Sequence, residues 1–179
     1  RNWRQLIILL SVQYVGVFVL TLQHLPLGMA TVKIIAGWMS AAILGMTRSN
    51  LTEDEAQGQS ILPQGRFFRL VAAAIVGLIA VSGATRVDSM MADAGIAVSA
   101  GSLLLIGMGL LHLGVTDQAM RVSVGLMTVL AGFEVLYAAV ENSVLVAALL
   151  AIINLGLALV GAYLMIASNA TEENETEAV

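Results

Sequence analysis

The sequence predicts an all-α integral membrane protein with six transmembrane helices. First, 59% of its 179 residues are hydrophobic and only 11% are charged, with a mean hydropathy of +0.92, a composition unlike that of soluble domains. Second, the chain contains apolar runs of about 17 to 25 residues, the length that a helix needs to cross a bilayer. Third, these runs lack the polar and apolar alternation of barrel strands, and only helices otherwise satisfy the backbone in lipid.

The predicted transmembrane helices follow one another closely along the chain. They occupy residues 5–22, 28–46, 67–85, 94–113, 120–140 and 144–167. Polar or turn-forming breaks separate them: LQHLPLG, TRSNLTEDEAQGQSILPQGR, TRVDSMMAD, HLGVTDQ and ENS. Without the short ENS break, the last two runs would form one helix of implausible length.

Local signals refine two of these boundaries. Thr116 or Asp117 can cap the free amides at the start of the fifth helix. The segment TEDE at 52–55 has the form of a capping box, so a short surface helix is possible there. A solvated acidic loop is the favoured interpretation of that segment.

The second helix carries a stripe of small residues. Gly37, Ala41 and Gly45 repeat every four residues and therefore lie along one face. Such a face allows another helix to approach closely. We expect it to serve assembly without chemistry of its own.

The basic residues predict the orientation in the membrane. Arg86 alone lies in a loop on one side, and the other side holds Arg1, Arg4, Arg48, Arg66, Arg69 and Arg121. Because Lys and Arg concentrate in cytoplasmic loops, we expect both termini and the long loop at 47–69 to be cytoplasmic. The expected location is a bacterial-type inner (plasma) membrane.

Few ionisable residues lie outside the loops, and two of them lie inside apolar runs. Lys33 is in the second helix and Glu134 in the fifth, with Glu141 at the end of the fifth. A charge at the bilayer centre costs roughly 3 kcal/mol on insertion scales, so such residues usually face protein or water. Lys33 and Glu134 are predicted at similar depth, about 10 Å from the outer surface for Glu134. They can pair if their helices are neighbours.

Two interpretations of these residues remain open. In the first, the pair is a static ion pair, or Lys33 extends outward to water on its long side chain. In the second, Glu134 exchanges a proton. Burial favours the protonated carboxyl group, whereas a nearby ammonium favours the carboxylate, so the balance between the two forms can be tuned. Tyr137 and Glu141 lie on the same helix face and could extend a proton path outward. Asn154, in the last helix, could join it or simply bond another helix.

Several chemistries find no support. The chain has no cysteine and only two histidines, which leaves no thiolate metal site and no predicted metal ligands. His24 is predicted at the outer end of the first helix and His112 at the inner end of the fourth, a mismatch in depth that argues against bis-histidine haem. Either histidine alone could contact a pigment or a quinone. We expect no cofactor, no nucleic-acid partner and no catalytic activity of the chain's own.

From about residue 95 onward the chain resembles the small three-helix subunit of complex I (the K or 4L type), of membrane-bound hydrogenases and of Mrp-type cation/proton antiporters (the C subunit). The resemblance rests on RVSVGLMTVLAGFEVLYAAVENSVLV, with a Gly-x-Glu pattern at Gly132 and Glu134, and on ALLAIINLGLALVGAYLM. It implies that Glu134 is the carboxylate of a proton-path helix. It divides the chain into three helices at 1–93, a three-helix unit at 94–168 and an acidic tail at 169–179.

The sequence departs from this family in the last helix. In complex I that helix bears a second buried glutamate, whereas here only Asn154 lies nearby, which favours the antiporter or hydrogenase branch, or a subunit that has lost pumping. We therefore expect an integral membrane subunit of a multi-subunit proton- or cation-translocating complex, with other membrane subunits and lipid as partners. The alternative is a structural subunit that anchors a respiratory or photosynthetic assembly. A stand-alone solute transporter is also possible, although no internal repeat or broken helix favours it.

Overall fold

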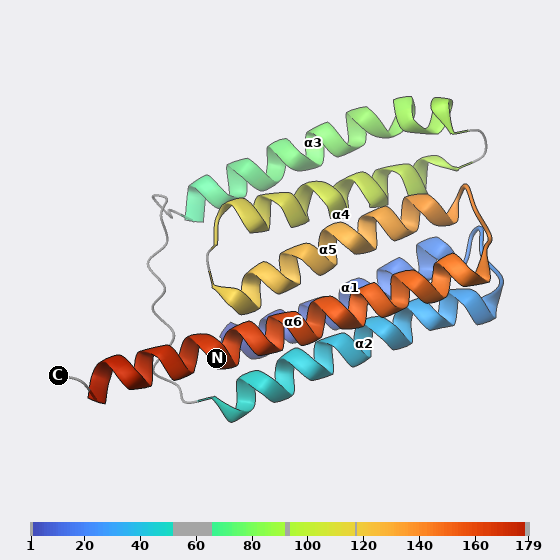
Figure 1. The fold of residues 1–179 in the computed structure, drawn as a ribbon. Helices are drawn as coiled ribbons and strands as arrows, with labels where there is room; N and C mark the ends of the chain where they lie inside the picture. The colour runs from blue at the N-terminus through green and yellow to red at the C-terminus, as the bar shows by residue number, and fades with distance from the viewer. Residues whose placement is uncertain (1, 52–65, 92–93, 117, 178–179) are drawn as a thin grey trace.

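The computed structural model describes residues 2–51, 66–91, 94–116 and 118–177 and shows only helices there (Figure 1). Each helix contains a segment long and apolar enough to cross a membrane. The helices are α1 (Asn2–Thr21), α2 (Leu27–Asn50), α3 (Arg66–Met90), α4 (Ile96–Gly114), α5 (Ala119–Ala138) and α6 (Val144–Glu177). The predicted all-α fold with six helices of transmembrane length is confirmed.

The boundaries differ from the predicted ones most at the C-terminal ends of α2, α3 and α6. α5 begins at Ala119 after Gln118, which makes no side-chain capping bond, so the predicted cap at Thr116 is wrong. Asp117 and the TEDE segment lie outside the described residues. α5 ends at Ala138, and α6 continues into the tail expected at 169–179 as far as Glu177, a stretch with neither Gly nor Pro.

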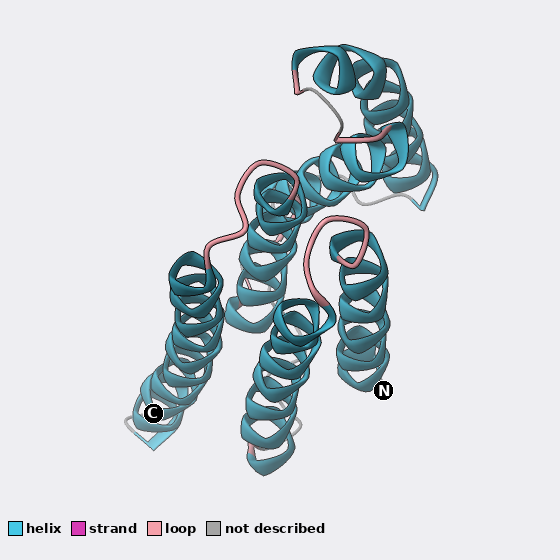
Figure 2. Cartoon of the chain, turned by 90° about the vertical axis from the view of Figure 1, so that its right-hand side faces the viewer, coloured by secondary structure: helices cyan, strands magenta, loops and turns pink. Residues whose placement is uncertain are grey.

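Four of the helices form a ring. α1 packs against α2 and α5, and α6 also packs against both α2 and α5, so α2 and α5 are opposite members, as are α1 and α6 (Figure 2). α4 covers the outer side of α5, and α3 packs against α4. Of the helices predicted at 1–93, α1 and α2 thus join α5 and α6 in the ring, while α3 lies outside it.

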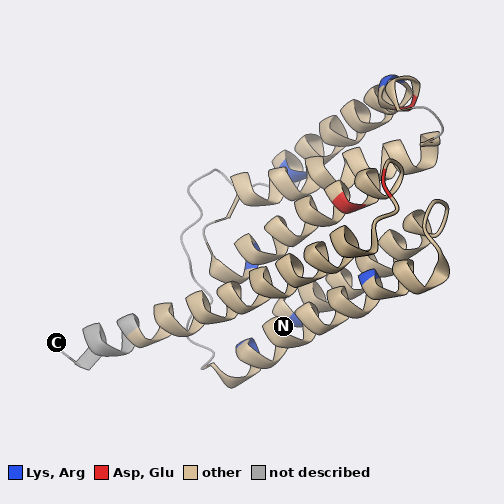
Figure 3. Ribbon diagram, turned by 45° about the vertical axis from the view of Figure 1, so that its right-hand side comes forward, with Lys and Arg blue, Asp and Glu red and all other residues tan. Residues whose placement is uncertain are grey.

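The two ends of the bundle differ in what they contain. One end, which we call the termini end, contains the start of α1 and the end of α6, and the other, the turn end, contains the short connections at 22–26 and 139–143 and the end of α3 (Figure 1). Charged residues are few along the coloured part of the helices in Figure 3. The α1–α2 and α5–α6 connections lie at the same end because successive helices run in opposite directions.

Glycines set the closest approaches between helices. A Cβ atom at Gly132 would lie 2.8 Å from the Ser102 carbonyl oxygen of α4, and one at Gly109 would lie 2.9 Å from the Gly125 carbonyl oxygen of α5. The backbones of α4 and α5 therefore meet almost directly. On α2, the predicted stripe faces α1: Gly37 meets a side chain of α1, and Ala41 is buried.

Candidate functional site

The interior of the four-helix ring contains a buried ion pair. Lys33 Nζ on α2 lies 3.2 Å from Glu134 Oε1 on α5, and the two side chains are only 3% and 2% exposed. Because α2 and α5 are opposite members of the ring, the long lysine side chain crosses the ring interior to reach the carboxylate. Beyond their ion pair, neither Lys33 Nζ nor Glu134 Oε1 has a hydrogen-bond partner among the described residues.

A second polar pair crosses the same interior between the other two opposite helices. The Tyr14 hydroxyl of α1 donates a 2.8 Å hydrogen bond to Asn154 Oδ1 of α6, and both side chains are buried. Gly37 allows this crossing, because a Cβ atom there would overlap the Tyr14 ring. Gly37 lies one turn from Lys33 on α2, and the Glu134 carboxylate acts electrostatically on the Tyr14 hydroxyl. The two pairs therefore form one neighbourhood.

A third polar contact lies deeper along α5. Thr128 Oγ1 lies 3.2 Å from Gln13 Oε1 of α1 and donates to the Val124 carbonyl oxygen at 2.8 Å. Thr128 precedes Glu134 by six residues, or about 9 Å along the helix. Apolar side chains fill the remaining space around these groups, among them Leu10, Val17, Leu44 and Met127.

The other residues predicted for a proton path lie apart from the ion pair. Tyr137 is half-buried, and its ring stacks on Phe133 at 5.9 Å between ring centroids rather than bonding the Glu134 carboxyl group. Glu141 is exposed in the turn that follows α5. The structure thus brings Lys33 and Glu134 together, and Asn154 lies in the same neighbourhood through its hydrogen bond with Tyr14. Tyr137, which is half-buried, and Glu141, which is exposed, do not join this group.

Tyr14 is the residue of this site that the sequence did not single out. Ser11, Gln13 and Tyr14 introduce three polar groups into the apolar run of the first helix. That local cluster was the available signal, since a buried tyrosine or glutamine in a membrane helix needs a partner. The partner itself depends on which helices are opposite in the ring.

The described residues contain no group of three or more His, Cys, Asp or Glu side chains placed to hold a metal ion. His24 lies at the turn end, and His112 lies near the end of α4 at the termini end. The two histidines therefore lie at opposite ends of the bundle. The ring interior offers an ion pair and several hydrogen-bonding groups.

Comparisons with models of protein families, with curated proteins and with solved structures find no match to this chain. The described residues form six helices, each able to span a membrane by length and composition, with an ion pair across the central ring. The resemblance to the small complex I and antiporter subunit therefore depends only on the sequence patterns around Glu134 and in the last helix.

Proposed function

We propose that the chain is an integral membrane subunit of a multi-subunit proton- or cation-translocating complex, and that Glu134 exchanges a proton within it. The ion pair carries this proposal. A buried ion pair is firmly held only when further hydrogen bonds satisfy both partners, and the described part of the chain supplies none to Lys33 Nζ and Glu134 Oε1. Transfer of one proton from the lysine ammonium to the carboxylate gives a neutral amine and a neutral carboxylic acid, which removes both charges from the interior.

The polar groups along the ring support a path to this pair. Tyr14 with Asn154, and Gln13 with Thr128, lie farther along their helices from the turn end than the pair does. Hydroxyl and amide groups can pass protons only when they lie within hydrogen-bonding reach or are joined by water. Glu141, at the turn-end surface, is the entry point that we assign to this path.

The resemblance of the C-terminal half supports the same kind of assembly. Glu134 occupies the position of the family's intramembrane carboxylate, two residues after Gly132. Asn154 lies in the last helix, where complex I carries a second glutamate, and it is engaged by Tyr14. We therefore favour an antiporter-type or hydrogenase-type complex, with other membrane subunits as partners.

We also propose that the termini end is cytoplasmic, in a bacterial-type inner membrane. Arg4, Arg48, Arg69 and Arg121 lie near this end, whereas Arg86 lies near the turn end. The chain has no cysteine, so Ser143→Cys and Gly114→Cys each introduce a single thiol at opposite ends. A membrane-impermeant maleimide should label only the Ser143→Cys variant in intact cells, and the reverse pattern would exclude this orientation.

The Glu134→Gln variant tests the proposed function. Gln keeps the shape of the side chain but cannot release a proton at the carboxyl group. We expect ion translocation by the intact assembly to be lost while its subunit composition is unchanged. The matched control is Asp88→Asn, which replaces a carboxylate on α3 outside the ring and should leave translocation unchanged. Unchanged translocation by a correctly assembled Glu134→Gln complex would refute the proposal.

The alternative function is that of a structural subunit that anchors other proteins in a respiratory or photosynthetic assembly. The surface of α3 favours it: Phe67 is 80% and Leu78 is 72% exposed, and α3 packs mainly against α4. Such a helix offers a long apolar face to lipid or to another subunit. Under this alternative, Glu134→Gln would weaken assembly, and any complex that still formed would translocate ions normally.

A further inference from the structure

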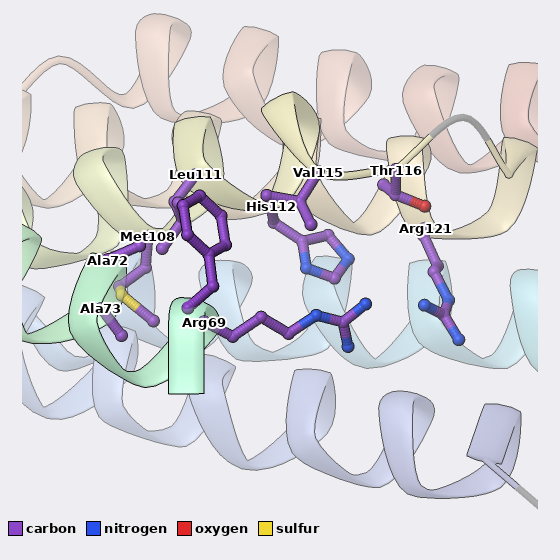
Figure 4. A pocket seen from close by; sticks show the side chains of 10 residues that line it. Arg69, Ala72, Ala73, Met108, Leu111, His112, Val115, Thr116 and Arg121 are labelled. Atoms are coloured by element: carbon purple, nitrogen blue, oxygen red, sulfur yellow. The ribbon is translucent and has the colours of Figure 1, made fainter. Parts of the chain in front are cut away.

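A pocket of about 190 Å³ lies at the termini end, between the start of α3, the end of α4 and the start of α5 (Figure 4). Its lining includes Arg69, His112 and Arg121 together with several apolar side chains. Arg121 precedes Glu134 by 13 residues, or about 20 Å along α5. This basic pocket is therefore separate from the ion pair in the ring.

One end of the basic pocket is positively charged. Figure 4 shows the nitrogen-bearing ends of Arg69, His112 and Arg121 gathered on the same side, and both arginines act electrostatically on the histidine. Among the described residues, His112 Nε2 is buried without a hydrogen-bond partner. Arginine offers only donors, and a histidine N–H offers another. A ligand for His112 and Arg121 must supply acceptor oxygens and negative charge.

The ends of two helices add to this preference for an anion. α3 begins at Arg66 and α5 at Ala119, both beside the pocket, and neither has an acidic residue in its first turn. The partial positive charge of a helix N-terminus attracts anions. These helix starts therefore act in the same direction as the basic side chains.

The other end of the basic pocket is apolar. Ala72, Ala73, Met108 and Leu111 line it on the side away from the arginines (Figure 4). Beyond it, Leu70 is 69% and Leu110 is 56% exposed. A soluble phosphate uses only the basic end, whereas a lipid places its headgroup there and its acyl chains on the neighbouring apolar surface.

We propose that the basic pocket binds the phosphate-bearing headgroup of an anionic membrane lipid. Arg121 and His112 donate hydrogen bonds to the phosphate oxygens, and Met108 and Leu111 contact the start of the acyl chains. Basic pockets between membrane helices are suited to such headgroups. The site lies at the end that carries most of the chain's arginines, where anionic headgroups are attracted.

The test measures lipid binding by the purified full-length protein in neutral detergent. Phosphatidylglycerol and phosphatidylcholine are titrated separately, and native mass spectrometry counts the bound lipid. Arg121→Gln removes one phosphate donor, and Ala73→Phe fills the pocket without changing its charge. The control is Arg86→Gln, because Arg86 is exposed at the turn end. Far-UV circular dichroism and size-exclusion profiles verify that each variant is folded.

We expect phosphatidylglycerol to bind more tightly than phosphatidylcholine. Arg121→Gln should weaken phosphatidylglycerol binding about fivefold. This factor corresponds to the free energy that one basic side chain contributes near an anionic lipid surface. Ala73→Phe should weaken it as well, and Arg86→Gln should leave it unchanged. Equal affinity for the two lipids would overturn the proposal, as would equal losses in Arg121→Gln and Arg86→Gln. Displacement of the lipid by equimolar glycerol 3-phosphate would show that the ligand is a soluble phosphate.

Discussion

Removing the cation of the buried ion pair should strongly destabilise the protein. At 3.2 Å between Lys33 Nζ and Glu134 Oε1, and with an effective dielectric constant of about 20, the attraction between unit charges is roughly 5 kcal/mol. Lys33→Met removes this attraction and leaves the carboxylate buried, which typically costs about 3–5 kcal/mol. Glu134→Leu leaves the ammonium unpaired and should cost a similar amount.

The double variant separates the pair from its individual residues. Lys33→Met with Glu134→Leu replaces both charges by apolar groups of similar size, a change that is often neutral or stabilising. We therefore expect the double variant to lie within about 1 kcal/mol of the parent protein. The coupling free energy would then exceed either single effect, which is the signature of residues in direct contact.

The assay is reversible unfolding in mixed micelles with increasing sodium dodecyl sulfate, followed by far-UV circular dichroism. The control Arg86→Met removes an exposed charge at the turn end and should change the free energy of unfolding by less than about 0.5 kcal/mol. Small and additive effects of the two single variants would show that the pair contributes no coupling, and the argument from its burial would then fail.

Two further substitutions test the second polar crossing. Gly37→Ala places a Cβ atom against the Tyr14 ring and should cost about 1–3 kcal/mol of unfolding free energy through overpacking. The control Gly156→Ala, with nothing within 4 Å of its added atom, should be neutral or slightly stabilising. Equal effects of the two variants would contradict the close approach of Gly37 and Tyr14. Tyr14→Phe leaves Asn154 Oδ1 without its donor and should cost about 1–3 kcal/mol, whereas Tyr163→Phe, at a side chain that is 70% exposed, should cost almost nothing in the same assay.

The sequence predicts the helices well because bilayer-spanning length is a property of each run by itself. The position of α5 shows where this information ends. Thr116 is a good capping residue, yet α5 begins at Ala119 after Gln118, because packing and the connection to α4 override a local preference. Similarly, the tail at 169–179 looks like a solvated segment, but its backbone continues α6 as far as Glu177.

The site is partly predictable, because the depth of a residue within one helix can be read from that helix alone. Counting residues from the helix ends places Lys33 and Glu134 at similar depth, which is enough to suggest a pair. Counting does not say which helices are neighbours, so Tyr14 and its bond to Asn154 are visible only once α1 and α6 are known to be opposite members of the ring. Helix arrangement depends on close contacts between small residues of different helices, and the sequence of a single apolar run does not reveal them.

The Gly-x-Glu pattern itself has a physical explanation in this fold. Gly132 and Glu134 are two residues apart, so their side-chain directions differ by about 200° around α5. Gly132 faces α4, where its missing Cβ permits the approach of the Ser102 carbonyl oxygen, and Glu134 faces the ring interior and Lys33. A helix packed tightly on one side and carrying a buried carboxylate on the other would show this pattern without any common ancestry. The proposed function therefore depends more on Lys33, which lies outside the resemblance, than on the motif that first draws attention to Glu134.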